Sequence, residues 1–308
     1  MTIEIRKLTV DFVYPRRRIE ALKGVDAVFR EGRISGIVGE SGCGKSVLGM
    51  ALLRLLPGNA AVSGQCLYGG RDLLGLEGEE LRSLRRRDIA LIPQNPYESL
   101  NPGRRIGKIL RDAIEPALRR DWRKIVSDML VRLGFMEPER VMNSCSFELS
   151  GGMNQRILVA LALLRSPRWI LADEPTKGLD PSLTREMAGM FRDIADQVGS
   201  LLLISHDLKL ARELCDDLFV MYGGRIVERG DCAQIFDRPA HPYTSGLLGA
   251  LPSNGLVPIP PLLENRDGSR GCPFYPRCSR ALPRCGGEEP DFCGIGPRDR
   301  EVRCFLYA

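Results

Sequence analysis

Eight consecutive residues, from Gly39 to Ser46, carry the clearest chemical signal in this 308-residue sequence. They read Gly-Glu-Ser-Gly-Cys-Gly-Lys-Ser and fit the phosphate-binding pattern G-x-x-x-x-G-K-[ST]. In such a loop the glycines let backbone amides face the phosphates, the lysine reaches the outer phosphates, and the last hydroxyl can ligate magnesium. Lys45 and Ser46 would have these two roles here. We therefore expect a nucleotide site whose contacts come from Gly39, Ser41, Gly42, Cys43, Gly44, Lys45, Ser46 and Val47.

Four further polar residues could take part in phosphate chemistry. Asp173 could hold the magnesium ion, directly or through water, and Glu174 could polarise an attacking water molecule. Gln94 is placed where ligands bind in an open α/β sheet, at the carboxyl end of a strand, and His206 is a candidate contact for the terminal phosphate. All four follow short apolar runs that are typical of buried strands, at 169–172, 89–92 and 201–205.

A second candidate anion site lies at residues 149–156, which read Leu-Ser-Gly-Gly-Met-Asn-Gln-Arg. Ser150 is placed as the N-cap of a helix, two glycines leave the first backbone amides uncovered, and the apolar run 157–164 continues the helix. An ordinary capped helix is the alternative. The paired glycines weigh against it, because glycine lowers helix stability.

The elements around these motifs indicate an α/β fold. An apolar run at 34–38 precedes the phosphate loop as a strand, and a helical pattern follows it at 47–56. Residues 106–147 have a helical pattern without strand-like alternation. We expect a phosphate-loop NTPase core with an inserted helical subdomain at about residues 100–165 and an N-terminal antiparallel β subdomain, which includes expected strands at 2–13 and 21–29.

Composition limits the class of protein. The longest apolar run, at 157–164, is far shorter than the roughly 20 residues that span a bilayer, and the first residues do not resemble a signal peptide. We therefore expect a cytosolic protein, or one held at a membrane by partners. The net charge is +5, and the arginine clusters lack interleaved aromatic residues, so a solvated surface is favoured over a nucleic-acid groove.

Cysteines crowd the C-terminal segment. Because the chain is expected in the cytosol, the crowding favours a metal or cluster site over a disulfide framework. Four thiolates suit a [4Fe-4S] cluster or a zinc ion, and the absence of a tight C-x2-4-C pair favours the cluster modestly. Free thiols are the remaining alternative, and Cys293 is the odd one out. The proposed ligands are Cys272, Cys278, Cys285 and Cys304.

In this order, the motifs resemble the nucleotide-binding subunits of ATP-binding cassette (ABC) transporters. The phosphate loop resembles the Walker A motif of that family, Gln94 its Q-loop glutamine, residues 149–155 its LSGGQ-type signature, Asp173-Glu174 its Walker B end, and His206 its switch histidine. The signature departs slightly from the family, with Met153-Asn154 before the glutamine. The resemblance implies ATP and Mg2+ as ligands, adenine stacking on Tyr14 or else Phe12, Mg2+ ligation by Ser46, Gln94 and Asp173, and contacts to the ATP of a partner cassette from Ser150, Gly151, Gly152 and Gln155.

Within that family the sequence is similar to subunits of dipeptide, oligopeptide and nickel importers. The similarity rests on the extended segment after Gln94, on His241-Pro242-Tyr243-Thr244, and on the cysteine motif that begins at Gly271. It implies a peripheral ATPase on the cytoplasmic face of the inner membrane, with a [4Fe-4S] cluster in the tail. The implied partners are two permease subunits, a second and non-identical cassette, and indirectly an extracytoplasmic solute-binding protein, with no nucleic acid.

The resemblance predicts three regions: an ABC ATPase domain at 1–230, a helix and linker at 231–262, and a cysteine-rich extension at 263–308. A nickel or metal-chelate importer is the alternative cargo class. A soluble cassette that acts on ribosomes or DNA is an alternative of another kind, but such proteins usually have two cassettes or a long coiled-coil insertion, and neither is present. A phosphate-loop kinase would have no use for the signature or for His206.

Overall fold

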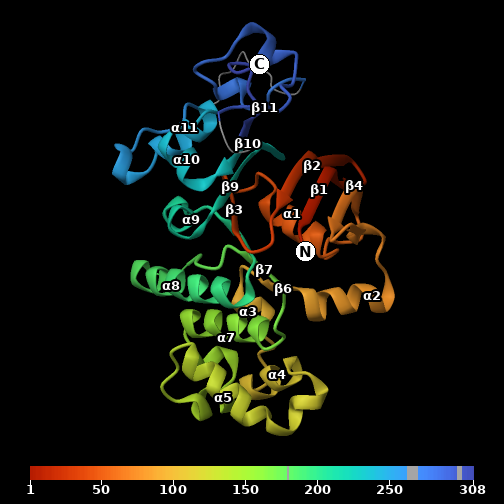
Figure 1. Ribbon diagram of the computed structural model, residues 1–308, viewed down its shortest axis with the longest axis vertical. Helices are drawn as coiled ribbons and strands as arrows, with labels where there is room; N and C mark the ends of the chain where they lie inside the picture. Colours follow the sequence, from red (N-terminus) through yellow and green to blue (C-terminus); the bar gives the residue numbers. More distant parts are fainter. Residues whose placement is uncertain (179, 262–269, 297–299) are drawn as a thin grey trace. The chain divides into compact units, whose positions relative to one another are not determined.

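The structure is a computed structural model that describes residues 1–178, 180–261, 270–296 and 300–308 (Figure 1). The chain forms two compact units. The first contains Met1–Gly75 and Leu203–Ala308, and the second contains Leu76–Leu202. The expected boundary at residues 262 and 263 lies outside the described residues.

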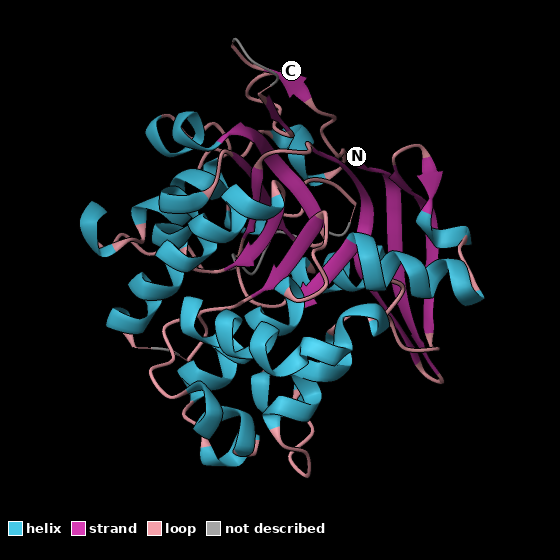
Figure 2. Cartoon of the chain, turned by 60° about the horizontal axis from the view of Figure 1, so that its bottom comes forward, coloured by secondary structure: helices cyan, strands magenta, loops and turns pink. Residues whose placement is uncertain are grey.

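The first unit contains a four-stranded antiparallel sheet in the order β2-β1-β4-β5 (Figures 1 and 2). Apolar side chains at alternate positions bury one face: Ile3 and Ile5, and after a register shift Leu8 and Val10, are each at most 1% exposed. This alternation is the pattern expected for a half-buried strand. The strands are β1 (Ile3–Tyr14), β2 (Arg17–Phe29), β4 (Ala60–Tyr68) and β5 (Arg71–Asp72).

A second sheet of the first unit positions the phosphate loop. Its strand order is β11-β12-β10-β9-β3-β8, where β3 and β9 are parallel and β9 and β10 form an antiparallel hairpin through Gly223 and Gly224. The strands are β3 (Ile34–Val38), β9 (Asp217–Tyr222), β10 (Arg225–Asp231), β11 (Cys293–Gly294), β12 (Glu301–Val302) and β8 (Leu201–Ser205), whose first two residues belong to the second unit.

The helices of the first unit are short. One follows the phosphate loop, and α9 to α11 lie between β8 and the cysteine-rich tail along the chain. They are α1 (Lys45–Leu52), α9 (Leu208–Leu214), α10 (Cys232–Asp237) and α11 (Pro242–Gly249), with 3-10 turns at Leu73–Gly75, Pro252–Asn254, Tyr275–Arg277 and Pro283–Gly286.

The second unit is mainly helical and contains the parallel pair β6 (Ile89–Ile92) and β7 (Trp169–Asp173). The helical pattern expected at 106–147 is present as several short helices. The helices of this unit are α2 (Gly78–Ser83), α3 (Pro96–Ser99), α4 (Ile106–Ala113), α5 (Trp122–Arg132), α6 (Pro138–Asn143), α7 (Gly151–Leu163) and α8 (Pro181–Val198), with a π turn at Leu84–Asp88 and 3-10 turns at Pro116–Asp121 and Ser146–Glu148.

The C-terminal tail shares a hydrophobic core with the strand that leads into the phosphate loop. Val38 at the end of β3, Tyr243 of α11 and Phe274 of the tail belong to one buried cluster. The rings of Tyr243 and Phe274 lie 5.5 Å apart, within the range of favourable aromatic contacts. The tail therefore packs on the phosphate-loop side of the first unit by side-chain contacts that join residues more than 200 positions apart in the sequence.

Candidate nucleotide site

The phosphate loop connects β3 to α1 and closes around Lys45. This side chain is only 5% exposed, and its Nζ donates hydrogen bonds to the carbonyl oxygens of Gly39 and Glu40, at 2.8 and 3.0 Å. The β9–β10 hairpin supports the loop from the other side, since the Gly224 N–H donates to the Cys43 carbonyl at 3.0 Å. The loop thus surrounds a buried ammonium group that is suited to bind an anion.

Two glycines of the phosphate loop are required by steric crowding as well as by the sequence motif. A Cβ on Gly39 would overlap the carbonyl oxygen of Met221. Gly44 has a φ of +106°, and a Cβ there would lie 2.7 Å from the carbonyl oxygen of Ala21. Larger residues at these positions would push the loop away from the strands that hold it.

In the second unit, Gln94 and Asp173 lie at the same end of the two parallel strands β6 and β7. The strands are parallel, with Ile92 opposite Ala172, so the residues that follow them leave the sheet at the same end. Asp173 is 7% exposed and Gln94 is half-buried. Both side chains offer oxygen atoms, which are the ligands that Mg2+ prefers.

Glu174 lies directly after β7 in an unusual backbone conformation. Its φ is +48°, in the left-handed region that non-glycine residues seldom adopt, and the residue is 8% exposed. Such a conformation costs about 1–3 kcal/mol and is found preferentially at functional sites. Strain and burial both single out this carboxylate.

The signature segment forms the start of α7. The Ser150 Oγ accepts a hydrogen bond from the Met153 N–H at 3.3 Å, so Ser150 is the N-cap that its position predicted. The Asn154 Nδ2 holds the preceding turn by donating to the Ser146 carbonyl at 2.8 Å. Gln155 is 3% exposed, and its Nε2 has no hydrogen-bond partner among the described residues.

His206 and Tyr14 lie in the first unit. His206 is exposed and follows β8, the strand next to β3 in the sheet, and Asp207 caps the helix after it. Tyr14 ends β1 with 42% of its surface exposed, and the Arg17 guanidinium lies 5.2 Å from its ring centroid. Phe12, the fallback for adenine stacking, is half-buried.

Four cysteines of the tail line a single small cavity. Burial, together with the neighbouring cysteines, raises the pKa of Cys272 to about 11, so this thiol is protonated at neutral pH without a ligand. Among the described residues, no group of three or more His, Cys, Asp or Glu side chains could hold a metal ion. The four cysteines around the cavity are Cys272, Cys278, Cys285 and Cys304.

Cys293 does not line this cavity. It lies in β11 opposite Val302 of β12, and its Sγ approaches the carbonyl oxygen of Asp291 at 3.8 Å. Cys293 therefore does not share the cavity with the other four cysteines of the tail.

Comparison with known families decides the class of this site. The family model described as ABC transporter matches residues 22–177, which contain the phosphate loop, the signature and the two acids at the end of β7. This chain belongs to the ABC transporter family. A second family model, described as the C-terminal region of oligopeptide/dipeptide transporters, matches residues 227–285. The predicted family is thereby confirmed, as is the expectation of an ATPase that drives transport.

Curated relatives of this ABC subunit match it over nearly its whole length. The dipeptide transport ATP-binding protein DppD of Caldanaerobacter subterraneus is 36% identical over 100% of this chain and 98% of its own. The oligopeptide transport ATP-binding protein OppD of Salmonella typhimurium is 35% identical over 94% of this chain and 89% of its own.

Solved structures confirm the cassette fold. The structure of cbiO1 from Clostridium perfringens, part of the ABC transporter complex cbiONQ, is 25% identical, with a TM-score of 0.64 over 77% of this chain and 90% of that protein. The ATP-binding cassette MJ0796, solved with ADP and Pi, is 24% identical with a TM-score of 0.65 over 75% and 98%. Among the described residues of this ABC subunit, no helix has the length and apolar character needed to cross a bilayer.

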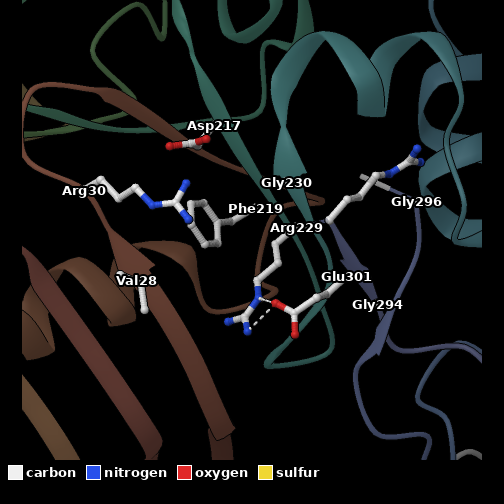
Figure 3. A pocket seen from close by; sticks show the side chains of 10 residues that line it. Val28, Arg30, Asp217, Phe219, Arg229, Gly230, Gly294, Gly296 and Glu301 are labelled. Carbon is white, nitrogen blue, oxygen red and sulfur yellow. Dashed lines mark hydrogen bonds and ion pairs between the residues drawn. The ribbon is translucent and has the colours of Figure 1, made fainter. Parts of the chain in front are cut away.

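A larger cavity of this ABC subunit, about 440 Å3, lies in the first unit (Figure 3). Its charged side chains are already paired: Arg229 with Glu301 at 2.7 Å, and Asp217 with Arg33 at 2.6 Å. None of the residues expected to bind the nucleotide lines it. Arg30, which also lines the cavity, points toward Asp217 in Figure 3. Because no expected nucleotide contact lines this cavity, we assign it no part in the ATPase site.

Sequence reasoning missed two residues that touch the phosphate loop. The Tyr243 Oη accepts a hydrogen bond from the Glu40 N–H at 2.9 Å, and the Arg277 Nη1 donates to the Glu40 carboxylate at 3.0 Å. Both belong to motifs that the sequence analysis recognised, yet nothing in their spacing indicates a contact with the ABC phosphate loop.

Proposed function

We propose that this chain hydrolyses ATP to power the import of dipeptides or oligopeptides through a membrane transporter. The observation that carries the cargo class is the match of residues 227–285 to the C-terminal region of oligopeptide/dipeptide transporters, outside the part that all cassettes share. Full-length relatives named for dipeptide and oligopeptide transport support the same cargo.

The residues of the proposed ATP site would have the following roles. Lys45 would bind the outer phosphates, and the oxygen ligands Ser46, Gln94 and Asp173 fit a magnesium ion, which would offset phosphate charge. Glu174 would take a proton from the attacking water or orient that water. His206 would stabilise charge on the terminal phosphate, while Tyr14 would stack on adenine. The backbone around Gly39, Ser41, Gly42, Cys43, Gly44 and Val47 would cradle the phosphates.

The ATP site would be completed by a second cassette. We propose that Ser150, Gly151 and Gly152, with Gln155 behind them, serve the ATP held by the partner cassette rather than their own. The start of α7, with its uncovered amides, is suited to face a phosphate of the partner's nucleotide. ATP binding would then favour the closed pair, and hydrolysis would release it, because a ligand shifts such an equilibrium only by its different affinity for the two states.

Co-purification tests the proposed assembly. We expect affinity-tagged chain, extracted with mild detergent, to recover two permease subunits and a second, non-identical cassette at the cytoplasmic face of the inner membrane. Transport assays of that complex with its solute-binding protein should show peptide uptake. Uptake of nickel or a metal chelate instead would overturn the cargo class, and a fully active chain without membrane partners would favour a soluble cassette.

The cysteine-lined cavity of the tail would hold a [4Fe-4S] cluster. The fit rests on one observation: the four cysteines line a single cavity. Four thiolates are the ligand set of a [4Fe-4S] cluster and also of a structural zinc ion, which is the alternative. The bound cluster would cross-link the tail, and the four cysteines would hold it as thiolates.

Replacing Cys272 with Ser should remove most of the iron and acid-labile sulfide from anaerobically purified protein, because one of four ligands is lost. Cys293→Ser is the matched control, since Cys293 lies in the same tail but outside the cavity. We expect it to retain the metal content of the wild type. One zinc per chain without iron would refute the cluster and support the zinc alternative.

A further inference from the structure

The tail holds the phosphate loop through one acidic side chain. Glu40 is the only acid between Gly39 and Ser46, and its two carboxylate oxygens each lie 3.0 Å from Nη1 of Arg277. The Arg277 side chain is 18% exposed and that of Glu40 is 37% exposed, so the pair is partly shielded from solvent. Both residues belong to the same compact unit.

The position of Arg277 is well defined by its surroundings. The residue ends the 3-10 turn Tyr275–Arg277, between Cys272 and Cys278, and its Nε donates to the Pro260 carbonyl at 2.8 Å. Burial alone would lower the pKa of Arg277, but hydrogen bonds to Tyr222 and Glu40 outweigh burial and raise it. The guanidinium is therefore a permanent positive charge that is held next to the loop.

The same loop residue is held a second time through its backbone. The Glu40 N–H donates to the Tyr243 Oη at 2.9 Å, and Tyr243 is fully buried. Its ring centroid lies 4.6 Å from that of Tyr222 and 5.5 Å from that of Phe274. The backbone N–H of Glu40 is thus directed toward α11, which packs on the tail, and its side chain is directed toward the tail itself.

This arrangement solves an electrostatic problem. A carboxylate in a loop that must accept a triphosphate repels the ligand, and the repulsion between like charges acts over several ångströms. The Lys45 ammonium has to attract the phosphates while Glu40 lies five positions before it. A guanidinium that pairs with Glu40 and draws its carboxylate toward the tail removes that repulsion.

We propose that Arg277 is a positioning residue for ATP binding, which neutralises Glu40 and keeps its carboxylate away from the nucleotide phosphates. The inference rests on the proposed binding of ATP at residues 39–46. Arg277 itself contacts the loop and not the reacting atoms. The docked tail thereby becomes part of the nucleotide site, in addition to any group that its cysteines hold.

Equilibrium binding of ATP in the presence of Mg2+ tests the proposal on the full-length chain. We expect Arg277→Ala to weaken ATP binding about three- to fivefold, the upper part of the range for a charge pair that is partly exposed to solvent. In steady-state assays KM for ATP should rise while kcat changes little. Since the cause is repulsion between charges, the loss should shrink as salt is raised from low to high ionic strength.

The double variant Glu40→Gln/Arg277→Ala separates electrostatics from a structural role. In the double variant the carboxylate that would repel the phosphates is gone, so the loss of Arg277 should no longer matter. The double variant should therefore bind ATP within about twofold of the wild type. Arg284→Ala is the matched control, because Arg284 packs over Phe305 and donates to the Phe305 and Ala308 carbonyls within the tail. It should bind ATP like the wild type.

Two results would overturn the proposal. The first is that Arg277→Ala binds ATP as tightly as the wild type. The second is that the weakened binding persists in the double variant, which would mean that the arginine acts only through folding of the tail. Failure of the wild type itself to bind ATP is a different outcome, since it would refute the proposed nucleotide site rather than the role of Arg277.

Discussion

We expect Glu174→Gln to lower the rate of ATP hydrolysis by about two to four orders of magnitude, the contribution typical of a positioned general base. Glutamine has nearly the same size and can adopt the same backbone conformation, but it cannot accept the proton of the attacking water. ATP binding should persist, because the proposed phosphate contacts come from other residues. The ATP-bound variant should then accumulate as a closed cassette pair.

Phosphate release measures the first effect, and size-exclusion chromatography with and without ATP measures the second. Glu139→Gln is the control, since Glu139 is an exposed acid on α6 of the same unit and pairs with Arg123 at the surface. Its hydrolysis rate should equal that of the wild type. Undiminished hydrolysis in Glu174→Gln would remove Glu174 from the proposed role of base.

The backbone conformation of Glu174 also supports a functional role for this residue. With φ at +48°, any residue except glycine is strained at this position. The glutamate therefore lowers the stability of the folded chain relative to a glycine at the same position. A protein selected only for stability would favour glycine. The presence of a buried acid in this conformation supports a role in chemistry rather than in packing.

Local patterns predicted the elements of the site well. Ser150 was expected as an N-cap and does cap α7, and the apolar runs before Gln94, Asp173 and His206 are strands. These features depend on neighbours within a few residues, where capping and period-two burial act. Boundaries were less accurate: β2 begins at Arg17 rather than at residue 21, because the hairpin continues the ladder into exposed positions.

Contacts between distant segments could not be predicted in the same way. Arg277 and Glu40 are 237 positions apart, and they meet only because the aromatic cluster around Tyr243 packs the tail against β9 and the loop. The strand order that places β9 between β3 and β10 is also a property of the whole unit. No periodicity or spacing in one sequence encodes such pairings directly.

We expect Gly151→Asp to abolish nearly all ATP hydrolysis while the chain still binds ATP. Gly151 is the first residue of α7, and a Cβ there would meet only the Tyr97 Oη, at 3.7 Å, which is an ordinary contact. The variant should therefore fold. Its carboxylate, however, would lie at the helix start that we propose faces the phosphate of the partner's ATP, where a negative charge repels the ligand and prevents closure.

Gly151→Ala is the matched control, because it adds the same Cβ without the charge. Hydrolysis should fall by about 100-fold or more in Gly151→Asp, comparable to the loss of a main electrostatic contact, and only slightly in Gly151→Ala. ATP affinity of the separate chain should be the same in both. A parallel loss of ATP affinity in Gly151→Asp would mean that α7 serves the chain's own nucleotide, and the proposal of a site shared between two cassettes would then be wrong.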